Sequence, residues 1–421
     1  MATMGGSSES FDLRDLNRPQ RVAVVVAGAG ARGGYEAGVL SVLLEQLEAA
    51  GIAPSLFVGT SAGAINATLF AATAHLPAAE QGELVLEVWR GIQTGDVFRS
   101  PVLTGLGSAG RWAGQLLRLP GVRLTNLLDT APLCRTADEA VDWNQLRANI
   151  DSGLTELAVV TTSGADNRTV VFVDRGGAGS LPPSDDDRPI DYMPARIEPS
   201  HVLASAAIPV VFPPVRVPPD PTIHGRWYLD GGVRLNTPLK PALSLDADAV
   251  VIVATHPAID RASDIAHTRP EEPPDVDDTL VRLMDAALVD RMVEDVRTLA
   301  KVNVLVAAAK ERCSPYELDG KTVVPFLAVG PEDRGTLGLL ANEVFGRRRS
   351  ALGGAMRLAR DPSMRLLGRV LGGDGSRRGD LLSYLFFDPE FMAASIELGR
   401  RDAAAAFEGT APGEIPWRIR T

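Results

Sequence analysis

The sequence contains few of the residues that form disulfide bonds or bind metal ions. Only two of its 421 residues are cysteine, Cys134 and Cys313, and only five are histidine. Two cysteines exclude a disulfide framework, and this is the composition expected in a reducing compartment. The histidines and cysteines form no cluster with metal-ligand spacing, and the acidic run at residues 185–187 lacks the spacing of a calcium loop. We therefore expect neither a metal nor another cofactor.

The chain also lacks an excess of positive charge and lacks long apolar runs. Its formal net charge is −11, and its sequence pI is about 5.1. Such a field repels nucleic acid and anionic lipid head groups, so we expect no nucleic-acid partner and a neutral or locally bound substrate. No apolar run is long enough to span a bilayer, and the first 20 residues show no secretory signal. We expect a cytoplasmic protein, either free or peripheral at the membrane; its oligomeric state is not indicated.

The order of the apolar segments predicts an α/β fold. Residues 22–27 and 56–58 are short apolar runs without alternation, which is typical of strands buried on both faces of a parallel sheet. Each run is followed by a glycine-containing turn and then by an apolar helical pattern, first over residues 39–47 and then over residues 62–74. This order predicts a mainly parallel central sheet flanked by helices.

We expect three regions along the chain. Residues 1–20 are small and polar and are predicted to form a disordered tail. Residues 21–330 are predicted to form the main domain, and residues 331–421 a mostly helical C-terminal extension packed on it. A stretch rich in glycine, proline and aspartate at residues 176–199 is predicted to be a surface loop. Further strands and one long helix are expected at residues 156–162, 169–173, 227–229, 249–254, 323–329 and 279–309.

Two glycine-rich turns follow the first two strands, and both suit acyl transfer. The first reads GAGARGG at residues 28–34, and the second reads GTSAG at residues 59–63. The second is the G-x-S-x-G pattern, in which glycines allow a sharp strand-to-helix turn that exposes the hydroxyl of Ser61. The N–H groups of the first turn would stabilise the oxyanion that develops on a substrate carbonyl.

Two other functions use similar patterns. The G-x-G-x-x-G spacing of Gly28, Gly30 and Gly33 occurs in dinucleotide-binding proteins, but these need an acidic residue at the end of the second strand, where this chain has a serine turn. An α/β-hydrolase would need a histidine, and only His256 lies just beyond a clear strand. Only two strands precede Ser61, fewer than that fold places before its nucleophile. His256 stays an alternative third member of a triad, because triads are defined by geometry.

A carboxylate can also activate a serine. Asp230 ends the strand at residues 227–229 and is followed by two glycines, which form a turn that holds its side chain clear of the backbone. Within hydrogen-bond reach of a serine hydroxyl, this carboxylate can accept the proton during nucleophilic attack. The alternative is that Asp230 only forms the turn, as most Asp-Gly pairs do.

From about residue 21 to residue 255, the sequence resembles the patatin-like phospholipase family. Four blocks carry this resemblance, and they occur in the order typical of the family. They are VVVAGAGARGGYEAGVL at residues 24–40, GTSAGAINA at residues 59–67, ASAAIPVVFPP at residues 204–214 and YLDGGVRLNTP at residues 228–238. Each block alone is common, whereas all four in order are specific. The resemblance implies a three-layer α/β/α fold and a metal-independent lipid acyl hydrolase.

The resemblance also implies roles for individual residues. Ser61 would be the nucleophile and Asp230 the general base, and an acyl-enzyme would form and then be hydrolysed by water. The implied oxyanion-binding residues are Gly28, Ala29, Gly30 and Arg32.

Two features of the oxyanion loop leave alternatives open. Family members usually carry glycine where this chain has Ala29, and alanine does not easily adopt a positive φ. If the loop needs a positive φ at Ala29, activity suffers; if φ is negative, the change is harmless. Arg32 either supports the oxyanion directly or pairs with a carboxylate such as Glu36.

The substrate is the least constrained part of the prediction. The resemblance favours esters of phospholipids, lysophospholipids or neutral lipids, reached through transient contact with a membrane surface. The segment from Phe98 to Leu133, which is rich in leucine and tryptophan, would form either a lid over the site or ordinary helical core. A second hypothesis is a catalytically weak lipid-binding or regulatory scaffold, which Ala29 and the long C-terminal region keep open.

Overall fold

The computed structural model describes most of the chain in separate stretches. They are residues 19–99, 128–177, 179–218, 227–257, 290–311, 321–350 and 378–420. The expected tail therefore lies almost entirely outside the described residues. So do most of the expected lid segment and the first part of the helix expected at residues 279–309.

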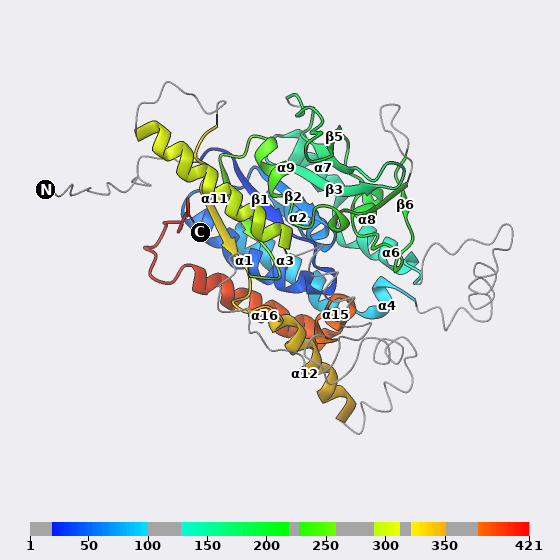
Figure 1. The fold of residues 1–421 in the computed structure, drawn as a ribbon. Helices are drawn as coiled ribbons and strands as arrows, with labels where there is room; N and C mark the ends of the chain where they lie inside the picture. Colours follow the sequence, from blue (N-terminus) through cyan, green and yellow to red (C-terminus); the bar gives the residue numbers. More distant parts are fainter. Residues whose placement is uncertain are drawn as a thin grey trace, which may run out of the picture.

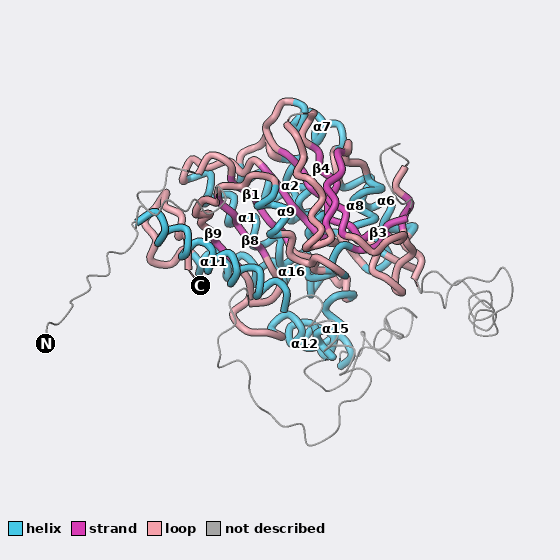
Figure 2. The backbone as a smooth tube through the Cα atoms, turned by 45° about the horizontal axis from the view of Figure 1, so that its top comes forward, coloured by secondary structure: helices cyan, strands magenta, loops and turns pink. Residues whose placement is uncertain are grey.

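A central sheet organises the structure (Figures 1 and 2). Its parallel strands follow the spatial order β9-β8-β1-β2-β3. Their bounds are β1 Val22–Val26, β2 Leu56–Thr60, β3 Glu156–Ser163, β8 Ala249–Val253 and β9 Phe326–Val329. The remaining strands are β4 Thr169–Asp174, β5 Ile190–Pro194, β6 Val215–Arg216 and β7 Trp227–Asp230; β4 and β5 lie beyond β3, whereas β7 pairs with the end of β3 and with β6. β4 runs antiparallel to β3, and β5 runs parallel to β4.

Helices cover both faces of this sheet. Successive side chains of a strand point to opposite faces, so a fully apolar strand such as β1 has apolar side chains to bury on each face. Val24 of β1 packs into the apolar cluster formed with α1, α2, α3 and α16, whereas Val25 packs into the cluster formed with α9 and α11. The bounds of these helices are α1 Gly33–Ala49, α2 Ala62–Thr73, α3 Ala78–Gly91, α16 Pro389–Ala406, α9 Leu239–Ser244 and α11 Asp290–Glu311. The predicted fold, a mainly parallel sheet flanked by helices, is confirmed.

The other helices and turns complete the described structure. They are α4 Thr94–Val97, α6 Ala131–Ala140, α7 Trp143–Asp151, α8 Pro199–Ser205, α12 Thr336–Ser350, α15 Arg378–Leu385 and the 3-10 turns η2 Gly30–Arg32 and η3 Gly231–Val233. No helix among the described residues is long and apolar enough to cross a bilayer.

One predicted loop contains a strand. Residues 176–199 were expected to form only a surface loop, but β5 lies within them and pairs with β4 from Thr169↔Ile190 to Val173↔Pro194. Buried Ile190 and Tyr192 alternate with more exposed residues. This short pattern is hidden in the sequence by the surrounding prolines and aspartates, and the neighbouring strand supplies the hydrogen bonds that define it.

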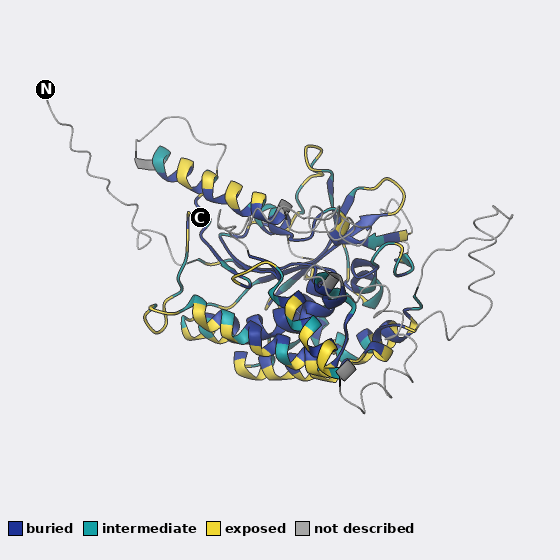
Figure 3. Ribbon diagram, turned by 60° about the horizontal axis from the view of Figure 1, so that its bottom comes forward, coloured by how far each residue is buried: buried dark blue, intermediate teal, exposed yellow. Residues whose placement is uncertain are grey.

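The C-terminal helices share the core of the sheet domain. Buried residues of α16 belong to the same apolar cluster as α1, and Figure 3 shows the buried residues of these helices facing inward. The two helices approach closely because glycines lie at their contact. A Cβ at Gly38 would collide with the carbonyl oxygen of Ile396, and a Cβ at Gly399 would collide with that of Tyr35.

The substitution Gly38→Ala tests this close contact. We expect it to lower the free energy of unfolding by about 1–3 kcal/mol, because a methyl group must be accommodated against the backbone of α16. Gly91→Ala is the matched control: its Cβ meets nothing within 4 Å, so a small gain of up to about 1 kcal/mol is expected. Denaturant titrations measure the free energy of unfolding of each variant. If Gly38→Ala is as stable as Gly91→Ala, the tight packing of α1 on α16 is contradicted.

Candidate active site

Ser61 lies in a strained turn between β2 and α2. Its backbone has φ 56° and ψ −127°, a conformation that costs a non-glycine residue about 1–3 kcal/mol and persists only where the surroundings enforce it. The flanking glycines enforce it here through close packing. A Cβ at Gly59 would collide with the backbone of Gly63, and a Cβ at Gly63 would collide with the carbonyl oxygens of Val26 and Ala27.

The strand register brings Asp230 to this turn. β4 occupies one edge of β3, so β2 and β7 share the other edge. β2 pairs with β3 as far as Thr60↔Val160, and β7 arrives from the opposite direction and ends at Thr161↔Asp230. The two strands therefore meet end to end, which places the residue after β2 beside the last residue of β7.

The hydroxyl of Ser61 donates a hydrogen bond of 2.7 Å to Oδ2 of Asp230. The other carboxylate oxygen, Oδ1, accepts a hydrogen bond of 2.7 Å from the N–H of Gly232. Burial raises the pKa of Asp230 to about 6, although both hydrogen bonds act to lower it. A carboxylate with this pKa is ionised near neutral pH and is still basic enough to accept a proton.

Ser205 supports the turn, a role that the sequence analysis missed. Its hydroxyl accepts a hydrogen bond of 2.8 Å from the N–H of Ser61 and donates one of 2.6 Å to the carbonyl oxygen of Val160. Ser205 belongs to the block at residues 204–214, so the motif was visible in the sequence, but its contact with Ser61 was not. This bridge fixes the backbone of Ser61 to β3.

The oxyanion loop follows β1 and passes close to Ser61. A Cβ at Gly28 would lie 3.2 Å from the Cβ of Ser61. The N–H of Gly28 donates to the carbonyl oxygen of Asn236 at 3.0 Å, so it is already used within the fold. Ala29 has φ −135°, which alanine adopts without strain, and the positive φ of 55° falls on Gly30.

The N–H groups of this loop that make no hydrogen bond within the described structure follow Gly28 in the sequence. Among the described residues, the N–H groups of Ala29 and Gly30 donate no hydrogen bond. Gly30 also lines the pocket that contains Ser61. These two N–H groups are available to an oxyanion, whereas that of Gly28 is not.

Arg32 is held by the C-terminal region and not by Glu36. Its buried guanidinium donates to Oδ1 of Asp380 at 3.0 Å and to the hydroxyl of Ser383 at 2.8 Å. It also lies over the ring of Tyr384, with Cζ 4.1 Å from the ring centre. Glu36 instead accepts a hydrogen bond from Asn66, and burial raises its pKa well above the usual range.

His256 lies next to Arg32 and takes no part in the serine contact. Its Nε2 lies 3.0 Å from Nη1 of Arg32, and burial together with the positive charge of Arg32 lowers its pKa well below the usual value. A neutral imidazole nitrogen accepts a hydrogen bond from the guanidinium N–H at this distance. Within the described residues, no hydrogen bond joins His256 to Ser61 or Asp230.

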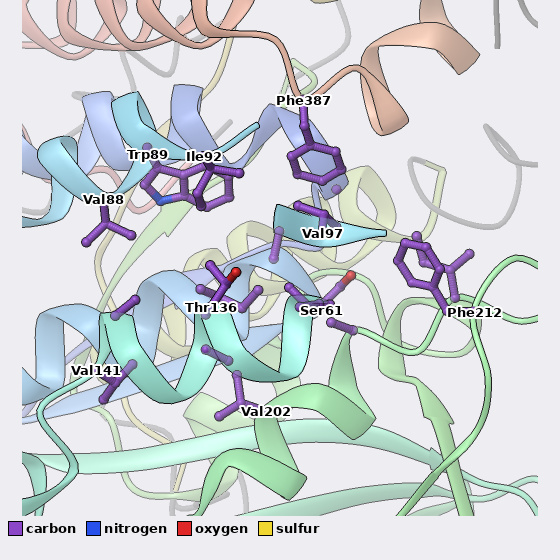
Figure 4. A pocket seen from close by; sticks show the side chains of 18 of the residues that line it. Ser61, Val88, Trp89, Ile92, Val97, Thr136, Val141, Val202, Phe212 and Phe387 are labelled. Carbon is purple, nitrogen blue, oxygen red and sulfur yellow. The ribbon is translucent and has the colours of Figure 1, made fainter. Parts of the chain in front are cut away.

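A narrow apolar pocket opens at Ser61, with a cavity volume of about 50 Å³. Figure 4 shows Ser61 between two groups of side chains, with Val88 and Val141 on one side and Phe212 and Phe387 on the other. Phe387 and its neighbour Leu385 come from the C-terminal region. The lining is almost entirely hydrocarbon, as a fatty acyl chain requires.

Among the described residues, no group of three or more histidine, cysteine, aspartate or glutamate side chains is placed to hold a metal ion.

The family of the chain follows from its sequence. The sequence model of the family described as "Patatin-like phospholipase" matches residues 24–243, which is just over half of the chain and includes all four blocks. The chain belongs to this family. Membership in the patatin-like phospholipases places it among lipid acyl hydrolases, and no curated protein shows significant sequence similarity to it.

Two solved structures resemble this patatin-like chain at low sequence identity. The crystal structure of VipD from Legionella pneumophila is 12% identical, with a TM-score of 0.35, and the match covers 93% of this chain and 67% of VipD. The structure of the heterodimeric ExoU–SpcU complex from the type III secretion system of Pseudomonas aeruginosa gives 16% identity and a TM-score of 0.28, over 93% of this chain and 78% of that one. At these TM-scores we infer nothing from either structure about the site.

The pKa of Asp230 leads to a pH prediction. Only the ionised carboxylate can accept the proton of Ser61, so kcat/KM should fall about tenfold per pH unit below pH 6 and level off above it. The measurement is the pH profile of kcat/KM for a soluble short-chain ester. The background rate measured with Ser61→Ala is subtracted at each pH. An inflection near pH 4, the ordinary range for aspartate, would contradict the effect of burial.

The contact between Arg32 and Asp380 leads to a second prediction. Asp380→Asn removes the charge that holds the loop through Arg32, so we expect kcat to fall by about tenfold to a hundredfold while KM changes little. Glu390→Gln is the control, because it removes an exposed ion pair with Arg347 in the same region. Steady-state kinetics and thermal unfolding are measured together; a loss of stability with unchanged kcat would assign Asp380 a purely structural role.

Proposed function

We propose that this patatin-like protein hydrolyses carboxylic ester bonds of lipids through Ser61 and Asp230, with an acyl-enzyme intermediate. The observation that supports the proposal most strongly is the hydrogen bond of 2.7 Å between the side chains of Asp230 and Ser61, which lines an apolar pocket. This arrangement needs no histidine, because among the described residues the Ser61 hydroxyl has its hydrogen bond with Asp230.

In the first half of the reaction, the oxygen of Ser61 attacks the ester carbonyl as its proton passes to Asp230. The negative charge that develops on the carbonyl oxygen is stabilised by the N–H groups of Ala29 and Gly30 and by the N-terminus of α2, which begins at Ala62. Asp230 then gives its proton to the departing alcohol oxygen, and the acyl group stays on Ser61.

In the second half, a water molecule attacks the acyl-enzyme. Asp230 accepts a proton from the water, the same N–H groups stabilise the second oxyanion, and the proton returns to the oxygen of Ser61 as the fatty acid leaves. A single carboxylate thus acts twice as base and twice as acid. A pKa near 6 suits both tasks, because the group changes its charge readily in each direction.

The pocket favours esters of fatty acids in phospholipids, lysophospholipids or neutral lipids. We further propose that the protein takes such substrates by transient contact with a lipid surface. Val210 is 69% exposed and lies between Ile208 and Phe212, which both line the pocket. An exposed apolar side chain at this place suits contact with a lipid surface.

The geometry favours an enzyme over a catalytically weak scaffold. Ala29 was the main reason to consider a weak oxyanion loop, and its negative φ removes the strain that alanine would introduce. A protein that only bound lipid would have no need to hold Ser61 in a strained turn beside an aspartate.

Substitution of the two side chains tests the proposal. We expect Ser61→Ala and Asp230→Asn each to lower the hydrolysis of a short-chain chromogenic ester by about 10⁴-fold or more. A panel of labelled phospholipids, lysophospholipids and triglycerides, assayed with a chelator present, then defines the lipid class. Circular dichroism checks that both variants are folded.

Two outcomes would contradict the proposal. If folded Asp230→Asn keeps wild-type activity, the aspartate is not the base. If the wild type hydrolyses no ester in the panel but binds lipid, the scaffold hypothesis is favoured instead.

A further inference from the structure

A buried asparagine joins three helices beside the site. Asn66 lies on α2, the helix that begins directly after Ser61, and its side chain is fully buried. Its Nδ2 donates to the carbonyl oxygen of Gly33 at 3.0 Å and to Oε2 of Glu36 at 3.2 Å, both at the start of α1. Its Oδ1 accepts a hydrogen bond of 2.7 Å from the indole N–H of Trp89 on α3. One side-chain amide therefore links α1, α2 and α3.

The chemistry of these partners leaves the amide one orientation. An indole N–H can only donate a hydrogen bond, and a backbone carbonyl oxygen can only accept one. The oxygen of Asn66 must therefore face Trp89, and its NH₂ group must face Gly33. Both N–H groups and the oxygen are used within the protein. The amide is thus engaged in holding its partners and is not left to bind a ligand.

The carbonyl that Asn66 holds belongs to the end of the oxyanion loop. Gly33 follows the turn η2 and donates its N–H to the carbonyl oxygen of Gly30. The N–H of Arg32 donates to the carbonyl oxygen of Ala29 at 3.1 Å. These two turn hydrogen bonds connect Gly33 to Ala29 and Gly30, whose N–H groups stabilise the oxyanion in the proposed reaction. A shift of Gly33 would therefore be passed on to both donors.

Trp89 holds the same end of the loop from its other side. A Cβ at Gly33 would collide with Cη2 of Trp89, so the indole ring lies directly against the backbone of Gly33. Trp89 also lines the pocket of Ser61 (Figure 4). The hydrogen bond from its N–H to Asn66 fixes how the ring lies in this wall. Gly33 is thus held between the amide of Asn66 and the ring that the same amide orients.

We propose that Asn66 is a positioning residue of the hydrolase, which sets the N–H groups of Ala29 and Gly30 relative to Ser61. It lies on the helix that follows Ser61 and holds the end of the oxyanion loop, so the oxygen of Ser61 and the two donors keep one arrangement. This inference rests on the proposed function. Donors that act on the oxyanion bind the transition state more strongly than the ester. Loss of the amide should therefore lower kcat and leave KM nearly unchanged.

The test compares Asn66→Ala with a matched control, Asn149→Ala. Asn149 is also buried, and its Nδ2 donates at 2.9 Å to the carbonyl oxygens of Ala71 and Ala72, at the far end of the same helix. None of these three residues lines the pocket of Ser61.

Both substitutions remove a buried amide that holds α2, so thermal unfolding should show a loss of stability in each. With para-nitrophenyl butyrate, Asn66→Ala should lower kcat by about tenfold to a hundredfold and change KM by less than about twofold. Asn149→Ala should keep kcat within about twofold of the wild type. A purely structural role of Asn66 would make the two variants alike.

Hydrogen exchange measures the position of the loop without any substrate. In the peptide that spans residues 28–34, the amides of Arg32 and Gly33 are protected by the turn hydrogen bonds. We expect them to exchange about fivefold faster or more in Asn66→Ala, and at the wild-type rate in Asn149→Ala. Trp89→Phe removes the indole N–H and serves as the second variant if Asn66→Ala does not fold; the same faster exchange is expected.

Three results would overturn the proposal. They are an unchanged kcat in folded Asn66→Ala, an equal loss of kcat in both alanine variants, and exchange over residues 28–34 that stays at the wild-type rate. If the wild type hydrolyses no ester, the proposed hydrolase function fails, and exchange alone decides whether Asn66 holds the loop. Faster exchange in Asn66→Ala but not in Asn149→Ala then supports this role, and equal exchange in the two variants overturns it.

Discussion

The structure depends most on the strained backbone at Ser61. A positive φ at a serine persists only if the surrounding chain leaves it no other conformation. Here β1, β2 and the start of α2 pack so closely that Gly59 and Gly63 admit no side chain, and Ser205 fixes the N–H of Ser61 to β3. The sheet core therefore does more than stabilise the fold, because it holds the backbone of Ser61 away from a relaxed conformation.

Arg32 and Asp230, two buried charged residues near the site, have separate surroundings. Arg32 is neutralised by Asp380 on the side of α15, and its hydrogen bonds among the described residues go to α15 and His256. Asp230 has no cation among its hydrogen-bond partners, so burial is the largest influence on its pKa. If Arg32 pointed at Asp230, it would stabilise the carboxylate and make it a weaker base.

The sequence predicts the parts of this arrangement that depend on local patterns. Apolar runs identify the buried strands, and the G-x-S-x-G block identifies the turn at Ser61. The pairing of Asp230 with Ser61 came from the family resemblance, since nothing local shows that β2 and β7 meet end to end along β3. The contact of Arg32 with Asp380 spans 348 positions and has no sequence signal at all. β5 was missed because its stability comes from the neighbouring β4 and not from its own composition.

The contribution of α15 to the site has a consequence for biosynthesis. Ser61 and Asp230 are both made in the first 230 residues, but the residues that hold Arg32 and complete the pocket wall come after residue 378. Domains begin to fold while the ribosome is still adding residues. A nascent chain would therefore contain Ser61 and Asp230 long before α15 can hold Arg32. Under the proposed function, full hydrolytic activity would then arise only near the end of translation.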